Sequence, residues 1–227
     1  MCTFRPEDTH ETDTLMSGWP FDIVHAVTHL SVTDPALGHV IHRVGAVTME
    51  PRPDEHPFEA LLRAIVYQQL SGKAAGTIHG RVLERVGEPP TPHRILATNP
   101  EDLRACGLSR AKTAAIIDLA HHTLDGTIPP AADLRESLNE DIVKRFTQVR
   151  GVGPWTVQMY LMFGLGRPDI LPVTDLGIRK AVQLLRGTEG LPEPEEVARE
   201  GAVWQPYRTV ASWYLWRSLD LEDAIPD

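Results

Sequence analysis

The sequence predicts an all-α, or mostly α, protein, and three kinds of observation lead to this prediction. Apolar residues recur at helical spacing in most segments, as in "FEALLRAIVYQQL" (58–70). Capping residues bracket such segments: in "DPALGHVIHRVG", Asp34 is the expected N-cap, Pro35 lies in the first turn and Gly45 ends the helix. Only "HRVGAVTM" (42–49) resembles a strand, so helices dominate the prediction.

The expected helices follow one another with short polar or proline-containing breaks. They cover 21–30, 34–45, 58–70, 73–87, 109–126, 139–149, 154–165, 175–187 and 203–219. One face of the third carries apolar residues that should be buried: Phe58, Leu61, Leu62, Ile65 and Val66. Ser109 is the expected N-cap of the fifth helix, and Gly126 closes it.

The composition is that of an ordinary globular protein. Of the 227 residues, 42% are hydrophobic and 23% are charged. We find no apolar run of the roughly 18 residues that span a bilayer and no secretion signal, so we expect a cytoplasmic protein with no membrane partner. Cys2 and Cys106 are too few for a disulfide framework, a cysteine-rich zinc site or an iron–sulfur cluster. His25 and His29 have metal-ligand spacing, but no cysteine or HExxH pattern supports zinc there.

The formal charge of −9 argues at first against a nucleic-acid partner, but the charge is unevenly distributed. Residues 60–180 hold 15 lysines and arginines against 12 acidic residues, a local balance of +3. The rest of the chain holds 7 against 19, a balance of −12. The mildly basic middle of the chain therefore permits a phosphate-binding face without predicting one.

The segment "VRGVGPWT" (149–156) has the composition of a tight connection between two helices. Gly151 and Gly153 allow a tight turn, and Pro154 suits the first turn of the next helix, where no N–H is required. A plain αα-hairpin is one interpretation of this pattern. The other is a helix–hairpin–helix whose exposed backbone N–H groups bind a DNA phosphate.

A second feature lies 22 residues after Gly153, where "LPVTDLGIRK" places Asp175 at the start of a helix. An aspartate at this position is an ordinary N-cap, which stabilises a helix by about 1 kcal/mol. Taken alone, Asp175 therefore does not indicate chemistry.

Three segments in order resemble a known family. "VRGVGPWTVQMYLMFGLGRPDILPVTDLGIRK" (149–180) resembles the helix–hairpin–helix/Gly-Pro-Asp signature of the DNA glycosylase superfamily. "FEALLRAIVYQQLSGKAA" (58–75) resembles the segment that fills the lesion gap in the 3-methyladenine DNA glycosylase II branch. "GLSRAKTAAIIDLA" (107–120) is similar to another DNA-facing segment of that branch. The resemblance covers about residues 20–220.

The resemblance implies a monofunctional glycosylase that flips and excises alkylated bases, of the 3-methyladenine and 7-methylguanine type, from double-stranded DNA. Asp175 would be the catalytic residue, either stabilising the positive charge that develops on the sugar or positioning water. Trp155 stands where strand-cutting relatives keep a lysine, so no Schiff base and no lyase activity are expected. A glycosylase for deaminated or oxidised bases and a non-catalytic helix–hairpin–helix protein remain alternatives.

The same resemblance assigns the other site residues. The expected base pocket comprises Trp155, Tyr207, Phe21, Trp19, Tyr160, Met159 and Trp204. The expected wedge that fills the gap left by a flipped base is Gln69, Leu70 and Ser71. The expected contacts with the DNA backbone are Arg150, Gly151, Val152, Gly153, Thr156, Lys73, Arg110 and Lys112. Core packing is the alternative for each aromatic, a solvent-facing helix end for the wedge, and a solvated surface charge for the lysines and arginines.

The resemblance also implies a cation site at the hairpin. The main-chain carbonyls of Thr147, Val149 and Val152 would hold a monovalent cation, Na⁺ or K⁺, that bridges to a DNA phosphate. No other cofactor is expected, and no iron–sulfur cluster.

We expect two helical lobes without a full N-terminal β domain, since only about 55 residues precede "FEALLRA". A flexible lead-in would cover 1–18. One domain would combine 19–57 with 180–227, and a central domain, 58–179, would contain the helix–hairpin–helix at 146–163. The protein is expected to act as a monomer in the bacterial cytoplasm, associated with the nucleoid.

Overall fold

The computed structural model describes residues 18–53 and 55–221, so the expected lead-in lies outside the described residues except for Gly18. Within these ranges the chain forms helices and no strand, which confirms the all-α prediction. The strand-like segment 42–49 instead contains the end of one helix and a stretch without regular secondary structure. No helix in the described ranges is long and apolar enough to cross a membrane.

The chain divides into two compact units: a terminal unit of residues 1–52 and 166–227, and a central unit of residues 53–165. The expected domains had the same interleaved order but other boundaries. The expected boundaries were 57/58 and 179/180, whereas the units meet at 52/53 and 165/166. The main difference has a physical cause, since the segment after residue 165 is bonded to the last helix. The Thr209 N–H donates to the Pro168 carbonyl at 2.9 Å, and the Arg208 guanidinium binds both oxygens of Asp169 at 2.6 and 2.8 Å.

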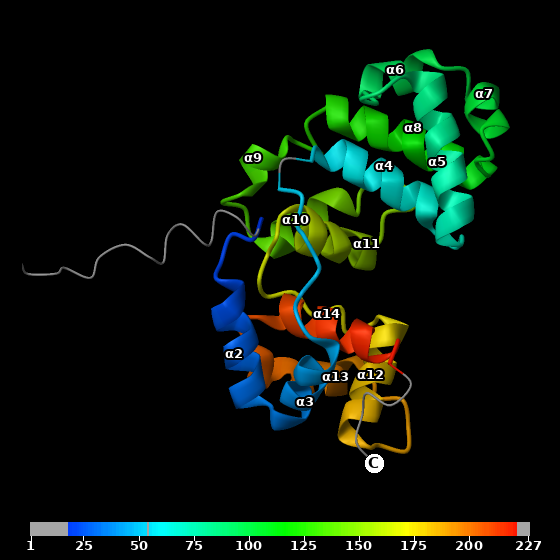
Figure 1. Cartoon of the computed structure of the whole chain (residues 1–227). Helices are drawn as coiled ribbons and strands as arrows, with labels where there is room; N and C mark the ends of the chain where they lie inside the picture. Colours follow the sequence, from blue (N-terminus) through cyan, green and yellow to red (C-terminus); the bar gives the residue numbers. More distant parts are fainter. Residues whose placement is uncertain (1–17, 54, 222–227) are drawn as a thin grey trace, which may run out of the picture. The chain divides into compact units, whose positions relative to one another are not determined.

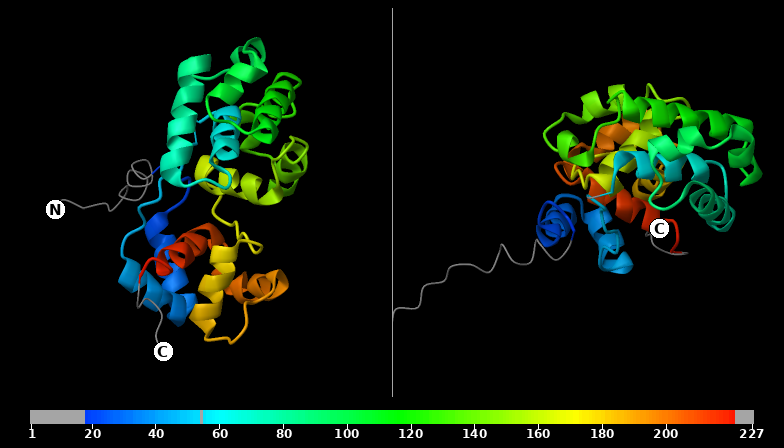
Figure 2. Two further views of the ribbon diagram at one scale, coloured as in Figure 1. Left: turned by 90° about the vertical axis from the view of Figure 1, so that its right-hand side faces the viewer. Right: turned by 90° about the horizontal axis from the view of Figure 1, so that it is seen from above.

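The terminal unit consists of helices from both ends of the chain, in blue and in yellow to red in Figure 1. Its elements are α2 (Ile23–Thr33), α3 (Pro35–Val44), α12 (Leu176–Arg186), α13 (Pro194–Glu200), the 3₁₀ helix η2 (Gly201–Trp204) and α14 (Arg208–Ser218). Helix α14 packs against α2, α3 and α12, and it can be followed in red in the left view of Figure 2. Leu30, Leu37, Trp204 and Tyr214 are fully buried in this core.

Asp34 joins three parts of the terminal unit. Its carboxylate caps α3 by accepting from the Ala36 and Leu37 amides, as the sequence predicted. It also binds Arg186 at 2.6 and 3.2 Å and the Trp204 indole N–H at 2.8 Å. Only 5% of Asp34 is exposed, so this buried carboxylate links α3, α12 and η2.

The central unit surrounds α4 (Pro57–Tyr67), which packs against α5, α8 and η1. Its other elements are α5 (Gly72–Val86), α6 (Pro92–Ala97), α7 (Pro100–Ala105), α8 (Arg110–Leu124), α9 (Ala131–Leu134), α10 (Asn139–Phe146), α11 (Pro154–Met159) and the π-helix η1 (Tyr160–Gly164). The five apolar residues predicted on one face of α4 are all buried. Ser109 caps α8 as predicted, since its hydroxyl accepts from the Lys112 amide.

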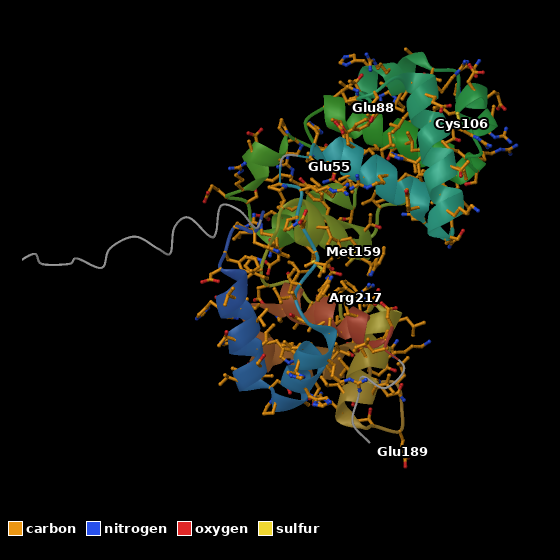
Figure 3. All side chains as sticks on the ribbon, viewed as in Figure 1. Glu55, Glu88, Cys106, Met159, Glu189 and Arg217 are labelled. Atoms are coloured by element: carbon orange, nitrogen blue, oxygen red, sulfur yellow. The ribbon has the colours of Figure 1, made fainter. Side chains whose placement is uncertain are left out.

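Cys106, labelled in Figure 3, lies at the end of α7 in the central unit. It is 7% exposed, and its sulfur lies 3.5 and 3.4 Å from the carbonyl oxygens of Arg81 and Asp102, which its single S–H can reach as alternative acceptors. Burial raises the pKa of this thiol, so Cys106 packs as a small apolar residue in the neutral form.

Candidate functional site

The hairpin joins α10 to α11, and its two glycines differ in backbone conformation. Gly151 has φ of +75°, in the left-handed region that favours glycine. Gly153 has φ of −97°, which any residue adopts, and acts as the N-cap of α11 with Pro154 in the first turn. A Cβ added at Gly153 would meet no atom within 4 Å. The turn geometry therefore requires glycine at 151, whereas nothing in the protein requires it at 153.

Side chains from two other helices hold this hairpin. The Arg150 amide donates to the Asp118 carboxylate of α8 at 2.7 Å. The Gln68 side-chain amide, at the end of α4, donates to the Gly151 carbonyl at 2.9 Å. Within the turn, the Val152 amide donates to the Val149 carbonyl at 3.1 Å. The hairpin is therefore a fixed part of the central unit.

Most of the predicted DNA-backbone and wedge residues lie on the surface of the central unit. The exposed ones are Arg150, Gly151, Lys73, Arg110, Gln69, Leu70 and Ser71. Val152 and Thr156 are only 4% and 6% exposed, so of these two residues only the main chain is placed to meet a phosphate. Trp155, in the first turn of α11, is 43% exposed, an unusual amount for a tryptophan outside a binding surface.

The side chain of Lys112 is bound within the fold, unlike those of the exposed lysine and arginines predicted to contact DNA. It was expected to contact a DNA phosphate, but its ammonium group donates to the carbonyls of Val66 and Gln68 at 2.8 and 2.7 Å. These carbonyls lie at the end of α4, where a positive charge is favourable. Burial lowers the pKa of Lys112, in keeping with an ammonium group turned into the protein. Two of its three N–H donors are thus bound within the fold.

The turn that Lys112 holds contains a strained residue. Gln69 has φ of +57°, and no other described non-glycine residue has a positive φ. For a residue with a side chain this conformation costs of order 1–3 kcal/mol, and it persists only where its surroundings enforce it. Such strain is often found at binding sites.

The three carbonyls expected to bind a cation keep lone pairs that no hydrogen bond within the described residues uses. Within the described part of the chain, no hydrogen bond reaches the carbonyl oxygens of Thr147 or Val152. The Val149 carbonyl accepts one, from Val152, which leaves it a second lone pair. Neutral oxygen donors with unused lone pairs suit a hard monovalent cation, so the hairpin fits the implied group.

Asp175, in the terminal unit, is the N-cap of α12 and is partly exposed. Its Oδ1 accepts from the Ile178 amide at 2.9 Å and from the indole N–H of Trp216 at 2.9 Å. Gly177 makes room for this second contact: a Cβ there would lie 3.0 Å from Asp175 Oδ1 and 3.0 Å from Trp216 Cδ1. The carboxylate is therefore held by a helix end and by an aromatic side chain of α14.

Trp216 was not among the predicted site residues. The predicted aromatic residue near this helix was Tyr207, which precedes α14. Trp216 lies nine positions further on, and nine helical residues span about 13 Å. The aromatic group that contacts Asp175 is thus at the other end of the helix. The local signal for it was Gly177, a helix-weakening residue two positions after Asp175 that marks a close approach.

Tyr207 belongs to a separate aromatic cluster in the terminal unit. Its ring lies 5.7 Å from that of Phe21, which lies 5.0 Å from Trp19. His25 shares a hydrogen bond with the Tyr207 hydroxyl at 2.9 Å, and His29 Nε2 donates to the Gln205 carbonyl at 2.8 Å. These contacts account for the metal-like histidine spacing, and no potential metal cluster of three His, Cys, Asp or Glu occurs in the described ranges.

The structure places three predicted pocket residues in cores. Trp204 has no exposed surface and donates to Asp34, so it supports the fold of the terminal unit. Trp19 and Tyr160 are each 4% exposed. The Tyr160 ring packs on Phe146 in the central unit, and burial, with the nearby Glu55 charge, raises the pKa of its hydroxyl. Core packing, the alternative interpretation, is therefore correct for Trp204 and fits Trp19 and Tyr160 better.

Met159 is half-buried at the end of α11, where Figure 3 labels it. It directly precedes the π-helical segment, in which the Leu165 amide donates to the Tyr160 carbonyl at 3.0 Å, five residues back. Short π segments inside helices are frequent at functional sites. Of the predicted pocket residues in the central unit, Trp155 and Met159 keep accessible surface.

Sequence comparisons find known proteins that are similar to this chain. Residues 62–206 match the model of the family described as HhH-GPD superfamily base excision DNA repair protein. The alkylbase DNA glycosidase-like protein mag2 of Schizosaccharomyces pombe is 34% identical over 199 residues, which are 86% of this chain and 93% of that relative. DNA-3-methyladenine glycosylase 1 of the same yeast is 35% identical over 207 residues, covering 88% and 90%.

A solved structure is also similar. That of the S. pombe 3-methyladenine DNA glycosylase Mag1 in complex with abasic DNA gives a TM-score of 0.80 at 33% identity. The match covers 89% of this chain and all of that one.

Proposed function

Because the chain belongs to the HhH-GPD superfamily of base excision DNA repair proteins, we propose that it is a DNA glycosylase for alkylated bases. Its substrates would be bases of the 3-methyladenine and 7-methylguanine type in double-stranded DNA. The observation that carries the proposal is the Asp175 carboxylate, which Ile178 and Trp216 hold in place. The chain that carries it is similar to proteins named as 3-methyladenine DNA glycosylases. We also propose that the protein acts on chromosomal DNA as a monomer.

Excision of an alkylated purine calls for a carboxylate near the sugar but not for a strong general acid. A purine alkylated at N3 or N7 carries a positive charge, so it departs as a neutral base when the glycosidic bond pair moves onto it. The sugar becomes oxocarbenium-like, and water adds at C1′ and loses a proton to give an abasic site. Asp175 supports this step either by electrostatic stabilisation or by orienting the water.

We also propose that the enzyme is monofunctional: it releases the base but does not cut the strand. A strand-cutting glycosylase uses an amine to form a Schiff base with the sugar. The corresponding position here is Trp155, whose exposed indole cannot form one. Its surface instead suits stacking on a flipped, positively charged base, together with Met159 of the same helix. The reaction would then stop at the abasic site.

The hairpin is the proposed DNA anchor. Its main-chain N–H groups lie at the start of α11, and no side chain at Gly153 obstructs an approaching phosphate. A Na⁺ or K⁺ ion held by the carbonyls of Thr147, Val149 and Val152 would add a positive charge beside that phosphate. Lys73, Arg110 and Arg150 supply further exposed charge.

A panel of lesions tests the substrate class. Duplexes carrying 3-methyladenine, 7-methylguanine, ethenoadenine, hypoxanthine, uracil or 8-oxoguanine are incubated with excess protein, and the released base is identified by mass spectrometry. We expect release of the two cationic methylpurines at the highest rates. Preferred release of hypoxanthine, uracil or 8-oxoguanine would support a glycosylase for deaminated or oxidised bases. DNA binding without release of any base would support a non-catalytic protein.

Gly177→Ala is expected to slow base release while leaving the fold as stable or more stable. The added Cβ would approach Asp175 and Trp216 to 3.0 Å, so one of them must move by a few tenths of an ångström. Small displacements of a catalytic group cost up to about 100-fold in rate, and we expect a loss of about 10-fold. Alanine also favours the helix by roughly 0.5–1 kcal/mol relative to glycine.

Single-turnover release and thermal unfolding measure both effects. Gly80→Ala in α5 is the matched control, since a Cβ there meets nothing within 4 Å. It should raise stability similarly and keep the release rate. A Gly177→Ala variant that works at the wild-type rate would show that the Trp216–Asp175 contact does not depend on this glycine.

A further inference from the structure

The turn between α4 and α5 presents its residues to solvent in a conformation that the chain does not favour. Gln69 has φ of +57° and is exposed, as are Leu70 and Ser71. Apart from the Leu70 amide, which donates to the Tyr67 carbonyl at 3.3 Å, the turn has few main-chain hydrogen bonds of its own. Contacts from outside the turn must therefore hold it.

Lys112 supplies the first of these contacts from α8. Its ammonium group binds the Val66 carbonyl at 2.8 Å and the Gln68 carbonyl at 2.7 Å, on either side of Tyr67. The two oxygens converge on one donor, which fixes the direction in which the chain leaves α4. The backbone of Gln69 begins where this fixed segment ends.

Gln68 supplies the second contact. Its carbonyl binds Lys112, and its side-chain amide donates to the Gly151 carbonyl of the hairpin at 2.9 Å. The hairpin is itself bound to α8 through the Arg150 amide and Asp118. One connected set of hydrogen bonds thus includes the strained turn, α8 and the hairpin.

We propose that Lys112 is a positioning residue: through the carbonyls of Val66 and Gln68, its ammonium group holds Gln69 in the left-handed conformation that presents the wedge to DNA. The Gln68 side chain fixes the position of the wedge relative to the phosphate-binding hairpin. This role rests on the proposed function, since it concerns the wedge of a base-flipping enzyme. In this role Lys112 binds main-chain carbonyls of the protein, whereas an exposed lysine such as Lys73 would neutralise a DNA phosphate.

The test compares Lys112→Met with Lys73→Met. Methionine keeps the unbranched shape of the lysine side chain but is one atom shorter and cannot donate to the two carbonyls. We expect Lys112→Met to reduce base flipping, read from 2-aminopurine fluorescence beside a lesion, by about 10-fold. Its affinity for undamaged duplex should stay within about twofold of wild type, with the same salt dependence. Lys112→Arg, which keeps the charge and the donors, should recover most of the flipping.

Lys73→Met should give the opposite pattern. Loss of one exposed phosphate contact would weaken binding to undamaged duplex and reduce the slope of log affinity against log salt by about 0.9, with the flipping equilibrium of the bound complex unchanged. If Lys112→Met behaves like Lys73→Met, Lys112 is a phosphate contact and the proposal is wrong. It is equally wrong if Lys112→Met changes neither property.

Hydrogen exchange gives a readout that needs no activity. In free protein, Lys112→Met should raise amide exchange in the peptide spanning 66–71 by about 10-fold or more, with α10 and α11 outside the hairpin unchanged. Unchanged exchange at 66–71 would contradict the positioning role. Should the wild-type protein release no base, the proposed function fails, and this comparison still decides whether Lys112 holds the turn.

Discussion

Asp175→Asn is expected to slow base release by at least about 1000-fold, or about 4 kcal/mol of transition-state stabilisation, while the variant still binds lesion-containing DNA. Asparagine keeps an oxygen that can accept from Ile178 and Trp216, and it is also a good N-cap. The substitution therefore removes the negative charge with little change in geometry. The measurements are single-turnover release and equilibrium binding to the same duplex.

Asp175→Ala serves as the control for stability. It should lose the charge and also the cap of α12, which costs about 1 kcal/mol in unfolding free energy. If the asparagine variant released bases at the wild-type rate, the carboxylate would have only its structural role as an N-cap.

Asp34→Asn is expected to destabilise the terminal unit by about 3–5 kcal/mol, the usual cost of removing one partner of a buried ion pair. The side chain is 5% exposed and binds Arg186, Trp204 and the start of α3. Asparagine can still cap α3, so the measured loss reports the ion pair of Asp34 with Arg186. Urea unfolding followed by tryptophan fluorescence measures it. Glu200→Gln is the control: Glu200 binds the same arginine but is 46% exposed, and should cost at most about 1 kcal/mol.

The effect of Asp34 should depend on pH. Burial alone would raise its pKa, but hydrogen bonds from Arg186, Trp204 and the Leu37 amide, with the charge of Arg186, lower the pKa below its ordinary value of 3.8. A carboxyl group with a lowered pKa in the folded state stabilises fully above its unfolded pKa and loses this contribution as the pH falls through the folded one. The difference between wild type and Asp34→Asn should thus be constant from pH 7 to about pH 5 and shrink below about pH 4. A constant difference down to pH 2.5 would contradict this account.

Local signals in the sequence predicted the helices well because their causes are local. Asp34 with Pro35 and Ser109 were recognised as caps, and the apolar face of α4 was recognised from its spacing. The hairpin was found because a tight turn needs glycine at 151. Gly153 also lies in this connection, but its negative φ does not require glycine, and the sequence does not reveal the sign of φ.

Contacts between distant segments were not predictable in the same way. Trp216 meets Asp175 across 41 residues, and Lys112 reaches the end of α4 across 44 residues from Gln68. A lysine written in a sequence does not show whether its ammonium group faces solvent or carbonyl oxygens. The left-handed conformation of Gln69 has no side-chain signal either. The burial of Trp204 was not predictable from its neighbours, because its partner Asp34 lies 170 residues away and reaches it only in the packed terminal unit.

The most direct test of the central claim is product analysis of wild-type protein on a duplex with a single 7-methylguanine. The account predicts free 7-methylguanine and an intact strand with an abasic site, which breaks only on later treatment with alkali. Borohydride added during the reaction should trap no protein–DNA adduct, because Trp155 cannot form a Schiff base. Strand cleavage with a trapped adduct, or no free base at all, would contradict the account.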